Sequence, residues 1–149
     1  MGDPIASSVS PQPVKNVLFV CIGNSCRSQM AEAFANHLGR GALRAWSAGS
    51  VPFGRIAPEA CAVMKEEGLS LDGQYSKGLA DVPICSMDFI VSMGCGVVCP
   101  SPPGFAGRRV EWSIPDTYGG SLEDYRRARD LIKREVSLLF SRIEASEAR

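Results

Sequence analysis

Apolar and polar positions alternate along this chain in a way that predicts strands and helices in turn. Four short apolar runs favour β-strands, at 16–20, 43–47, 88–92 and 109–112. Apolar residues at helical spacing predict three helices, between the first loop and Gly39, from 57 to 68, and from 121 to 143. Strands that alternate with helices indicate an α/β fold with a parallel sheet covered on both faces.

The helix ends carry recognisable signals. Pro58 and Glu59 open the second helix, and Gly68 ends it. The pair Ser121 and Asp124 forms a capping box at the start of the last helix. The expected core face of that helix comprises Leu131, Ile132, Val136, Leu139, Phe140 and Ile143.

Length and composition indicate one compact domain. The chain has 149 residues, of which 45% are hydrophobic, enough for a single core. Residues 1–13, rich in proline and serine, are expected to form a disordered leader, and residues 14–149 the folded domain.

Charge and hydropathy argue against nucleic acid and membrane as partners. Sixteen basic and sixteen acidic residues give a net charge of zero, so no broad basic surface is expected. No apolar run approaches the roughly 20 residues of a membrane span. The first residues lack the basic start and apolar centre of a signal peptide. We therefore expect a cytoplasmic protein with reduced thiols.

The loop that follows the first strand has the features of an anion site with a nucleophile in it. A loop between a strand and a helix N-terminus offers unpaired N–H groups and the positive end of the helix dipole. Cys21 lies there, where such surroundings lower the pKa of a thiol. Arg27 supplies a planar fork for two oxygens of a tetrahedral anion. Gly23 and Asn24 tolerate positive φ, and Ser28 is placed to donate to the sulfur of Cys21.

The string Cys-Ile-Gly-Asn-Ser-Cys-Arg-Ser-Gln-Met-Ala-Glu at 21–32 resembles the low-molecular-weight tyrosine phosphatase superfamily, and within it the arsenate reductases. The resemblance extends over about 14–140. It implies a three-layer sandwich whose four-stranded parallel sheet has the strand order 2-1-3-4. It also implies that arsenate or phosphate is bound by the loop residues Ile22, Gly23, Asn24, Ser25, Cys26, Arg27 and Ser28.

Asp116 is the candidate general acid. It follows the last predicted strand, on the sheet edge where Cys21 lies, and a departing oxygen needs a proton. The family carries its acid in a loop reading Asp-Pro-Tyr or Asp-Pro-Ala, whereas Thr117 replaces the proline here. The alternative is an ordinary turn residue before Gly119.

Two further cysteines, Cys95 and Cys99, lie in a loop rich in glycine and proline. The resemblance implies that they are redox thiols: one attacks the sulfur of Cys21 to expel arsenite, and the other resolves the disulfide. Three other interpretations remain: small apolar loop residues, a zinc site, or a reductase in which only one of them cycles.

The remaining candidates have simpler explanations. Cys26 is expected to fill the loop, with a protective disulfide to Cys21 as the alternative. Cys61 and Cys85 are expected to be packed thiols. His37, the single histidine, lies far from these motifs, which argues against a histidine-based dyad or triad. Tyr118 is a candidate for the pocket wall.

The pattern as a whole favours an arsenate reductase that is served by thioredoxin or a glutaredoxin-type reductant, with no metal or organic cofactor. Gln29, where phosphatases usually have proline, and the segments 47–49, 64–68 and 76–79 resemble the reductase branch. The alternative is a low-molecular-weight protein tyrosine phosphatase with the same Cys21, Arg27 and Asp116. A non-catalytic oxyanion-binding protein is the third hypothesis, although binding alone needs neither a thiolate nor an acid.

Overall fold

A computed structural model describes residues 14–94 and 103–147 of the chain. The predicted leader at 1–13 and the loop cysteines Cys95 and Cys99 lie outside these described residues. The described part contains a four-stranded sheet in the order β2-β1-β3-β4, with every neighbouring pair parallel. The predicted strand order 2-1-3-4 is therefore confirmed.

The strands match the apolar runs of the sequence closely. Their bounds are Lys15–Cys21 for β1, Leu43–Gly49 for β2, Phe89–Ser92 for β3 and Arg108–Glu111 for β4. Strand β1 lies in the centre, and its side chains from Val17 to Val20 are fully buried on both faces of the sheet. A central parallel strand covered on both sides needs such a continuous apolar run.

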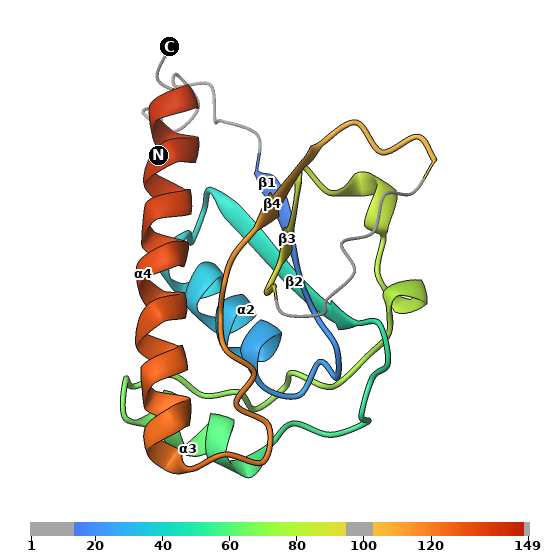
Figure 1. Ribbon diagram of the computed structural model, residues 1–149. Helices are drawn as coiled ribbons and strands as arrows, with labels where there is room; N and C mark the ends of the chain where they lie inside the picture. The colour runs from blue at the N-terminus through green and yellow to red at the C-terminus, as the bar shows by residue number, and fades with distance from the viewer. Residues whose placement is uncertain (1–13, 95–102, 148–149) are drawn as a thin grey trace, which may run out of the picture.

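Three α-helices form one layer of the molecule: two lie against one face of this sheet, and the third packs against those two (Figure 1). They are α2 (Arg27–Leu38), α3 (Pro58–Lys65) and α4 (Leu122–Glu147), and α4 runs along one side of the molecule. The opposite face carries two short 3₁₀ turns, η1 (Leu79–Asp81) and η2 (Ile84–Ser86). Alternate residues of β1 serve the two layers: Val17 and Phe19 pack with the α-helices, and Leu18 and Val20 with the segment around η1 and η2. The three-layer sandwich is confirmed, with 3₁₀ turns as its second helical layer.

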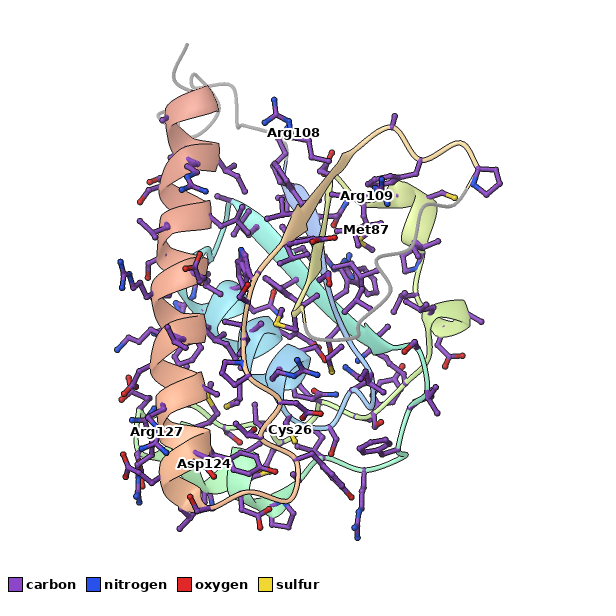
Figure 2. The ribbon with its side chains drawn as sticks, viewed as in Figure 1. Cys26, Met87, Arg108, Arg109, Asp124 and Arg127 are labelled. Atoms are coloured by element: carbon purple, nitrogen blue, oxygen red, sulfur yellow. The ribbon has the colours of Figure 1, made fainter. Side chains whose placement is uncertain are left out.

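The ends of the helices follow the expected signals with small differences. Helix α3 ends at Lys65, and Gly68 closes the following turn with a φ of +76°. Before α4, Asp124 N–H donates to Ser121 Oγ over 3.1 Å, and Ser121 N–H donates to Asp124 Oδ2 over 3.0 Å. The capping box is therefore present, and Figure 2 places Asp124 beside Arg127, its ion-pair partner, in the first turns of α4.

The core face of α4 is narrower than predicted. Ile132 and Val136 are fully buried, whereas Leu131 is 38% exposed, so its assignment to the core was wrong. Successive residues of a helix point about 100° apart. Leu131 therefore does not share the direction of Ile132, which packs into the core. No helix within 14–94 and 103–147 is long and apolar enough to cross a membrane.

Candidate active site

The loop between β1 and α2 is held from behind by the segment that follows β2. Backbone N–H groups of Ser50, Val51 and Phe53 donate to the carbonyls of residues 21, 22 and 23 over 3.1, 2.8 and 2.8 Å. Ala57 N–H does the same to the carbonyl of Ser25 over 3.0 Å. Because the loop carbonyls are engaged on the outside, the loop N–H groups are left for an anion on the inside.

Cys21 lies at the carboxyl end of β1 with two groups close to its sulfur. The Sγ atom is 2.8 Å from Ser28 Oγ, and Asn24 N–H donates to it over 3.2 Å. Asn24 Nδ2 donates to Ser28 Oγ over 2.8 Å, so that oxygen already accepts a hydrogen bond. The hydroxyl hydrogen of Ser28 is then free to point at the sulfur. Both groups stabilise a thiolate more than a thiol.

Asn24 and Gly23 stand in this loop for two different steric reasons. Asn24 has a φ of +48°, the conformation that asparagine tolerates better than most residues. Gly23 does not have the positive φ predicted for it, and that expectation was wrong. A Cβ on Gly23 would instead lie 2.5 Å from the ring of Phe53, so any larger residue would force this ring to move.

Arg27 begins α2 as one of the most deeply buried side chains, only 2% exposed. Its Nη1 donates to the carbonyl of Ile114 over 3.0 Å and to that of Gly94 over 3.5 Å. Its Nη2 lies 3.9 Å from Asp116 Oδ2. The guanidinium group is therefore fixed by backbone groups that follow β3 and β4.

Asp116 lies on the same edge of the sheet as Cys21, as the strand pattern predicts. Its carboxylate is about half exposed and accepts a hydrogen bond from Tyr118 N–H over 3.1 Å. This bond closes a turn of the Asx type at the point where the family has proline. Thr117 is buried, and its Oγ1 has no hydrogen-bond partner within the described part of the chain.

Cys26 fills the base of the loop, as predicted. It is buried, and its Sγ lies 3.3 Å from the hydroxyl of Tyr125 on α4. Figure 2 shows Cys26 near the first turns of that helix. Burial raises the pKa of the Cys26 thiol to about 11, so this thiol stays protonated at neutral pH.

Two aromatic rings stand at the mouth of the anion pocket. Phe53 and Tyr118 meet edge to face, with 4.7 Å between ring centroids, and both line the pocket with Cys21, Arg27 and Asp116. The position of Tyr118 agrees with the sequence prediction, whereas Phe53 was not singled out. The signal for Phe53 was its place just beyond the carboxyl end of the second strand, the edge where ligands bind in such sheets.

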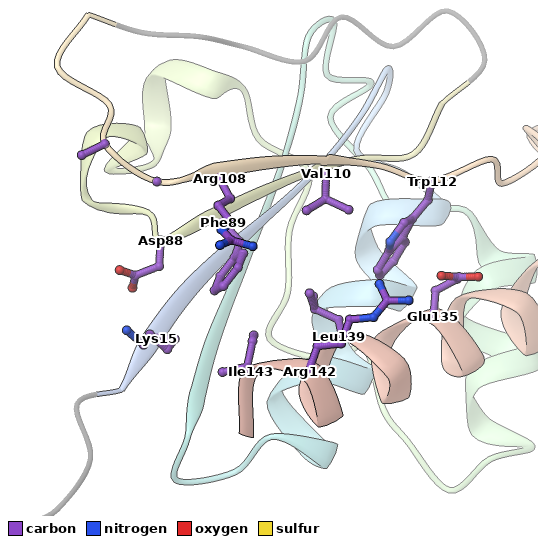
Figure 3. A pocket seen from close by; sticks show the side chains of 12 residues that line it. Lys15, Asp88, Phe89, Arg108, Val110, Trp112, Glu135, Leu139, Arg142 and Ile143 are labelled. Atoms are coloured by element: carbon purple, nitrogen blue, oxygen red, sulfur yellow. The ribbon is translucent and has the colours of Figure 1, made fainter. Parts of the chain in front are cut away.

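A larger hollow, with a volume of about 390 Å³, lies at the opposite end of the sheet (Figure 3). Figure 3 shows Val110 of β4 and Trp112, which directly follows this strand, pointing toward Leu139 and Arg142 of α4. Its lining includes no cysteine. We therefore place the reaction in the smaller pocket around Cys21.

The other predicted thiols differ in exposure. Cys61 on α3 is partly buried, and burial raises its pKa. Cys85 is exposed on η2, so the prediction of a packed thiol was wrong there. Its Sγ lies 3.6 Å from the carbonyl of Pro103, on the surface layer that covers the second face. Cys95 and Cys99 lie outside the described residues.

Gly49 provides a first test of how tightly this loop is packed. A Cβ on Gly49 would lie 2.5 Å from the Ile22 carbonyl and 2.8 Å from Asn24 N, both backbone atoms of the anion loop. We expect Gly49→Ala to lower the free energy of unfolding by about 1–3 kcal/mol. Urea unfolding of the variant measures this loss.

Gly78, the β-bridge partner of Gly49, gives a matched control. A Cβ there meets no atom closer than 3.5 Å, so Gly78→Ala should leave stability nearly unchanged. Equal unfolding midpoints for the two variants would contradict the steric account.

Comparisons with known proteins agree with this geometry. Residues 16–99 match the family described as low molecular weight phosphotyrosine protein phosphatase. A glutaredoxin arsenate reductase from Synechocystis sp. is 38% identical over 133 residues, which cover 87% of this chain and 99% of that protein. A solved structure of an arsenate reductase in the phosphate binding state has a TM-score of 0.78 at 38% identity, covering 87% of this chain and 99% of the other. The YwlE arginine phosphatase from Geobacillus stearothermophilus has a TM-score of 0.79 at 26% identity, covering 90% and 96%.

Proposed function

Because the chain belongs to the low molecular weight phosphotyrosine protein phosphatase family, we propose that it uses the family's thiol chemistry to reduce arsenate to arsenite in the cytoplasm. The domain that performs this reaction spans residues 14–149. The observation that carries the proposal is the Cys21 sulfur, held by Ser28 and Asn24 in an anion loop beside Arg27. The similarity to arsenate reductases over 87% of the chain supports arsenate as the substrate.

In the first step the loop N–H groups and Arg27 bind the arsenate anion. The Cys21 thiolate attacks arsenic, a sulfur–arsenic bond forms, and one arsenic–oxygen bond breaks. Asp116 gives its proton to the departing oxygen, which leaves as water. Arg27, with backbone carbonyls on one side and Asp116 on the other, keeps this carboxyl group near the anion.

In the second step a further thiolate attacks the sulfur of Cys21. Cys95 is the proposed attacking group. A disulfide forms between the two cysteines, and the electron pair of the sulfur–arsenic bond passes to arsenic, which leaves as arsenite. Cys99 then displaces Cys21 from the disulfide by exchange. Arsenic gains two electrons and two thiols lose them.

The oxidised protein needs an external thiol to start another cycle. We propose a thioredoxin or a glutaredoxin-type protein for this role. The name of the Synechocystis relative, a glutaredoxin arsenate reductase, supports the second of these.

Hydrolysis of phosphomonoesters is a second candidate activity. The half-exposed rings of Phe53 and Tyr118 at the pocket mouth favour it, since they offer an apolar surface to an aryl group beyond the bound phosphate. Water would then release phosphate from Cys21 without any redox step.

Asp116→Asn tests the proposed acid. We expect the rate of arsenite formation to fall about 100-fold, because the amide cannot donate a titrating proton to the leaving oxygen. A general acid loses its proton as the pH rises, which lowers the rate. This decrease in rate should be absent in Asp116→Asn. Asp72→Asn, a change of an exposed carboxylate away from the pocket, is the control. An unchanged rate and pH profile in Asp116→Asn would contradict the assignment.

A turnover assay separates the two activities. The protein is mixed with arsenate and either thioredoxin, thioredoxin reductase and NADPH or glutathione with glutaredoxin, and arsenite is measured. Steady arsenite production with one of these systems supports the reductase. Steady hydrolysis of an aryl phosphate with no arsenite from either system would make the protein a phosphatase.

A further inference from the structure

Lys77 is a lysine in an unusual place. Its side chain is only 7% exposed, although lysine is among the residues least often buried. The reaction described above makes no use of it. Its ammonium group lies among oxygens of three different parts of the fold, which gives a physical reason for its burial.

The contacts of this ammonium group join a loop to a helix and a strand. The Nζ atom donates to the carbonyl of Tyr75 over 3.1 Å and to Ser47 Oγ on β2 over 3.4 Å, and it lies 3.6 Å from Glu32 Oε1 on α2. Ser47 Oγ also donates to Glu32 Oε1. The Lys77 Nζ atom also lies 4.7 Å from the centre of the Tyr75 ring. The segment 75–77 is thereby fixed to α2, which follows the anion loop, and to β2, the sheet neighbour of β1.

The backbone of the same segment holds Asn24. Lys77 N–H donates to Asn24 Oδ1 over 2.8 Å. Gln29 Nε2 bridges the segment and the loop, donating to the carbonyl of Tyr75 over 2.9 Å and to that of Asn24 over 3.0 Å. Gln74 Nε2 in turn donates to Gln29 Oε1 over 2.7 Å. The amide of Asn24 is therefore oriented by groups that depend on where the segment lies.

We propose that Lys77 is a positioning residue for the Cys21 thiolate, acting through Asn24. Asn24 has a positive φ and places its N–H on the sulfur and its Nδ2 on Ser28 Oγ. Both groups that stabilise the thiolate therefore depend on how one residue, Asn24, is held. Loss of the Lys77 ammonium releases the segment and weakens both hydrogen bonds, so that the thiolate form of Cys21 is less well stabilised. The inference rests on Cys21 as the proposed nucleophile, but not on which substrate it attacks.

Alkylation of Cys21 by iodoacetamide as a function of pH tests this inference without any substrate. The reduced protein is alkylated, and the modified Cys21 peptide is quantified by mass spectrometry. In Lys77→Met we expect the midpoint of the alkylation profile to move up by about one pH unit, which is about a tenfold loss of rate below the midpoint. Lys65→Met, at an exposed lysine at the end of α3, should leave the midpoint unchanged.

A second variant separates positioning from stability. Lys77→Met leaves the largely buried Glu32 carboxylate without its cation, which by itself destabilises the fold. Glu32→Gln combined with Lys77→Met removes both charges and should recover the unfolding midpoint, while the alkylation midpoint stays raised. A normal alkylation profile in either variant, whatever its stability, would overturn the proposal. Because arsenite is not measured, failure of the reductase assignment leaves this test intact.

Discussion

Replacing Cys21 with serine is expected to abolish arsenite formation, with a loss of about 10⁴-fold or more in kcat. A serine hydroxyl is almost entirely protonated at neutral pH, and an oxygen nucleophile cannot go on to form a disulfide. Hydrolysis of an aryl phosphate should be lost in the same variant, because both activities begin with attack by the same sulfur. The measurement is a pair of turnover assays on the purified variant.

Cys61→Ser is the matched control for Cys21→Ser. Cys61 is a partly buried thiol on α3 outside the pocket, and both activities should stay within a few-fold of the parent protein. If Cys21→Ser kept arsenite formation above a tenth of the parent rate, Cys21 would not be the nucleophile.

Replacing Arg27 with lysine is expected to lower kcat by about 10³-fold, although the charge is kept. The guanidinium group of Arg27 uses Nη1 on the carbonyls of Ile114 and Gly94 and faces Asp116 with Nη2. A lysine ammonium cannot hold two oxygens of the anion in a plane and make these contacts as well. The rates and KM values for arsenate report the effect.

Arg108→Lys is the control for Arg27→Lys. Arg108 is exposed and begins β4, at the end of the sheet away from the pocket around Cys21. Figure 2 shows it far from Cys26, and Figure 3 shows it at the larger hollow. Its replacement should change neither kcat nor KM. A loss smaller than about tenfold in Arg27→Lys would mean that only the charge matters.

Much of the fold could be predicted because its strands are unusually clear in the sequence. The continuous apolar run of β1 indicates a central strand buried on both faces, and the strand order followed from the resemblance of the loop at 21–32. The segment 69–87 is different. Its buried residues Leu71, Val82 and Met87 have neither the period of a helix nor that of a strand, since they pack from turns. A layer built from turns has no periodic pattern of apolar residues, so the sequence does not predict it.

Some residues of the candidate site could likewise be predicted from the sequence, and others could not. Asp116 could be placed on the edge of the sheet where Cys21 lies, because the carboxyl ends of parallel strands meet at one edge, whereas its position 3.9 Å from Arg27 Nη2 came from the structure. Phe53, Lys77 and Tyr125 were not predicted to lie around the loop, since each reaches it from an element distant in sequence. Lysine is usually exposed, so the burial of Lys77 could not be predicted from the sequence. The structure explains it by the oxygens of Glu32, Ser47 and Tyr75 around the ammonium group.

A single turnover of the fully reduced protein with arsenate, without external reductant, tests the central claim most directly. Arsenite is measured, and the disulfides that have formed are mapped by peptide mass. The account predicts about one arsenite per protein molecule and a Cys21–Cys95 or Cys95–Cys99 disulfide, with Cys26 still a thiol. Free thiols throughout and no arsenite, while an aryl phosphate is hydrolysed steadily, would contradict it.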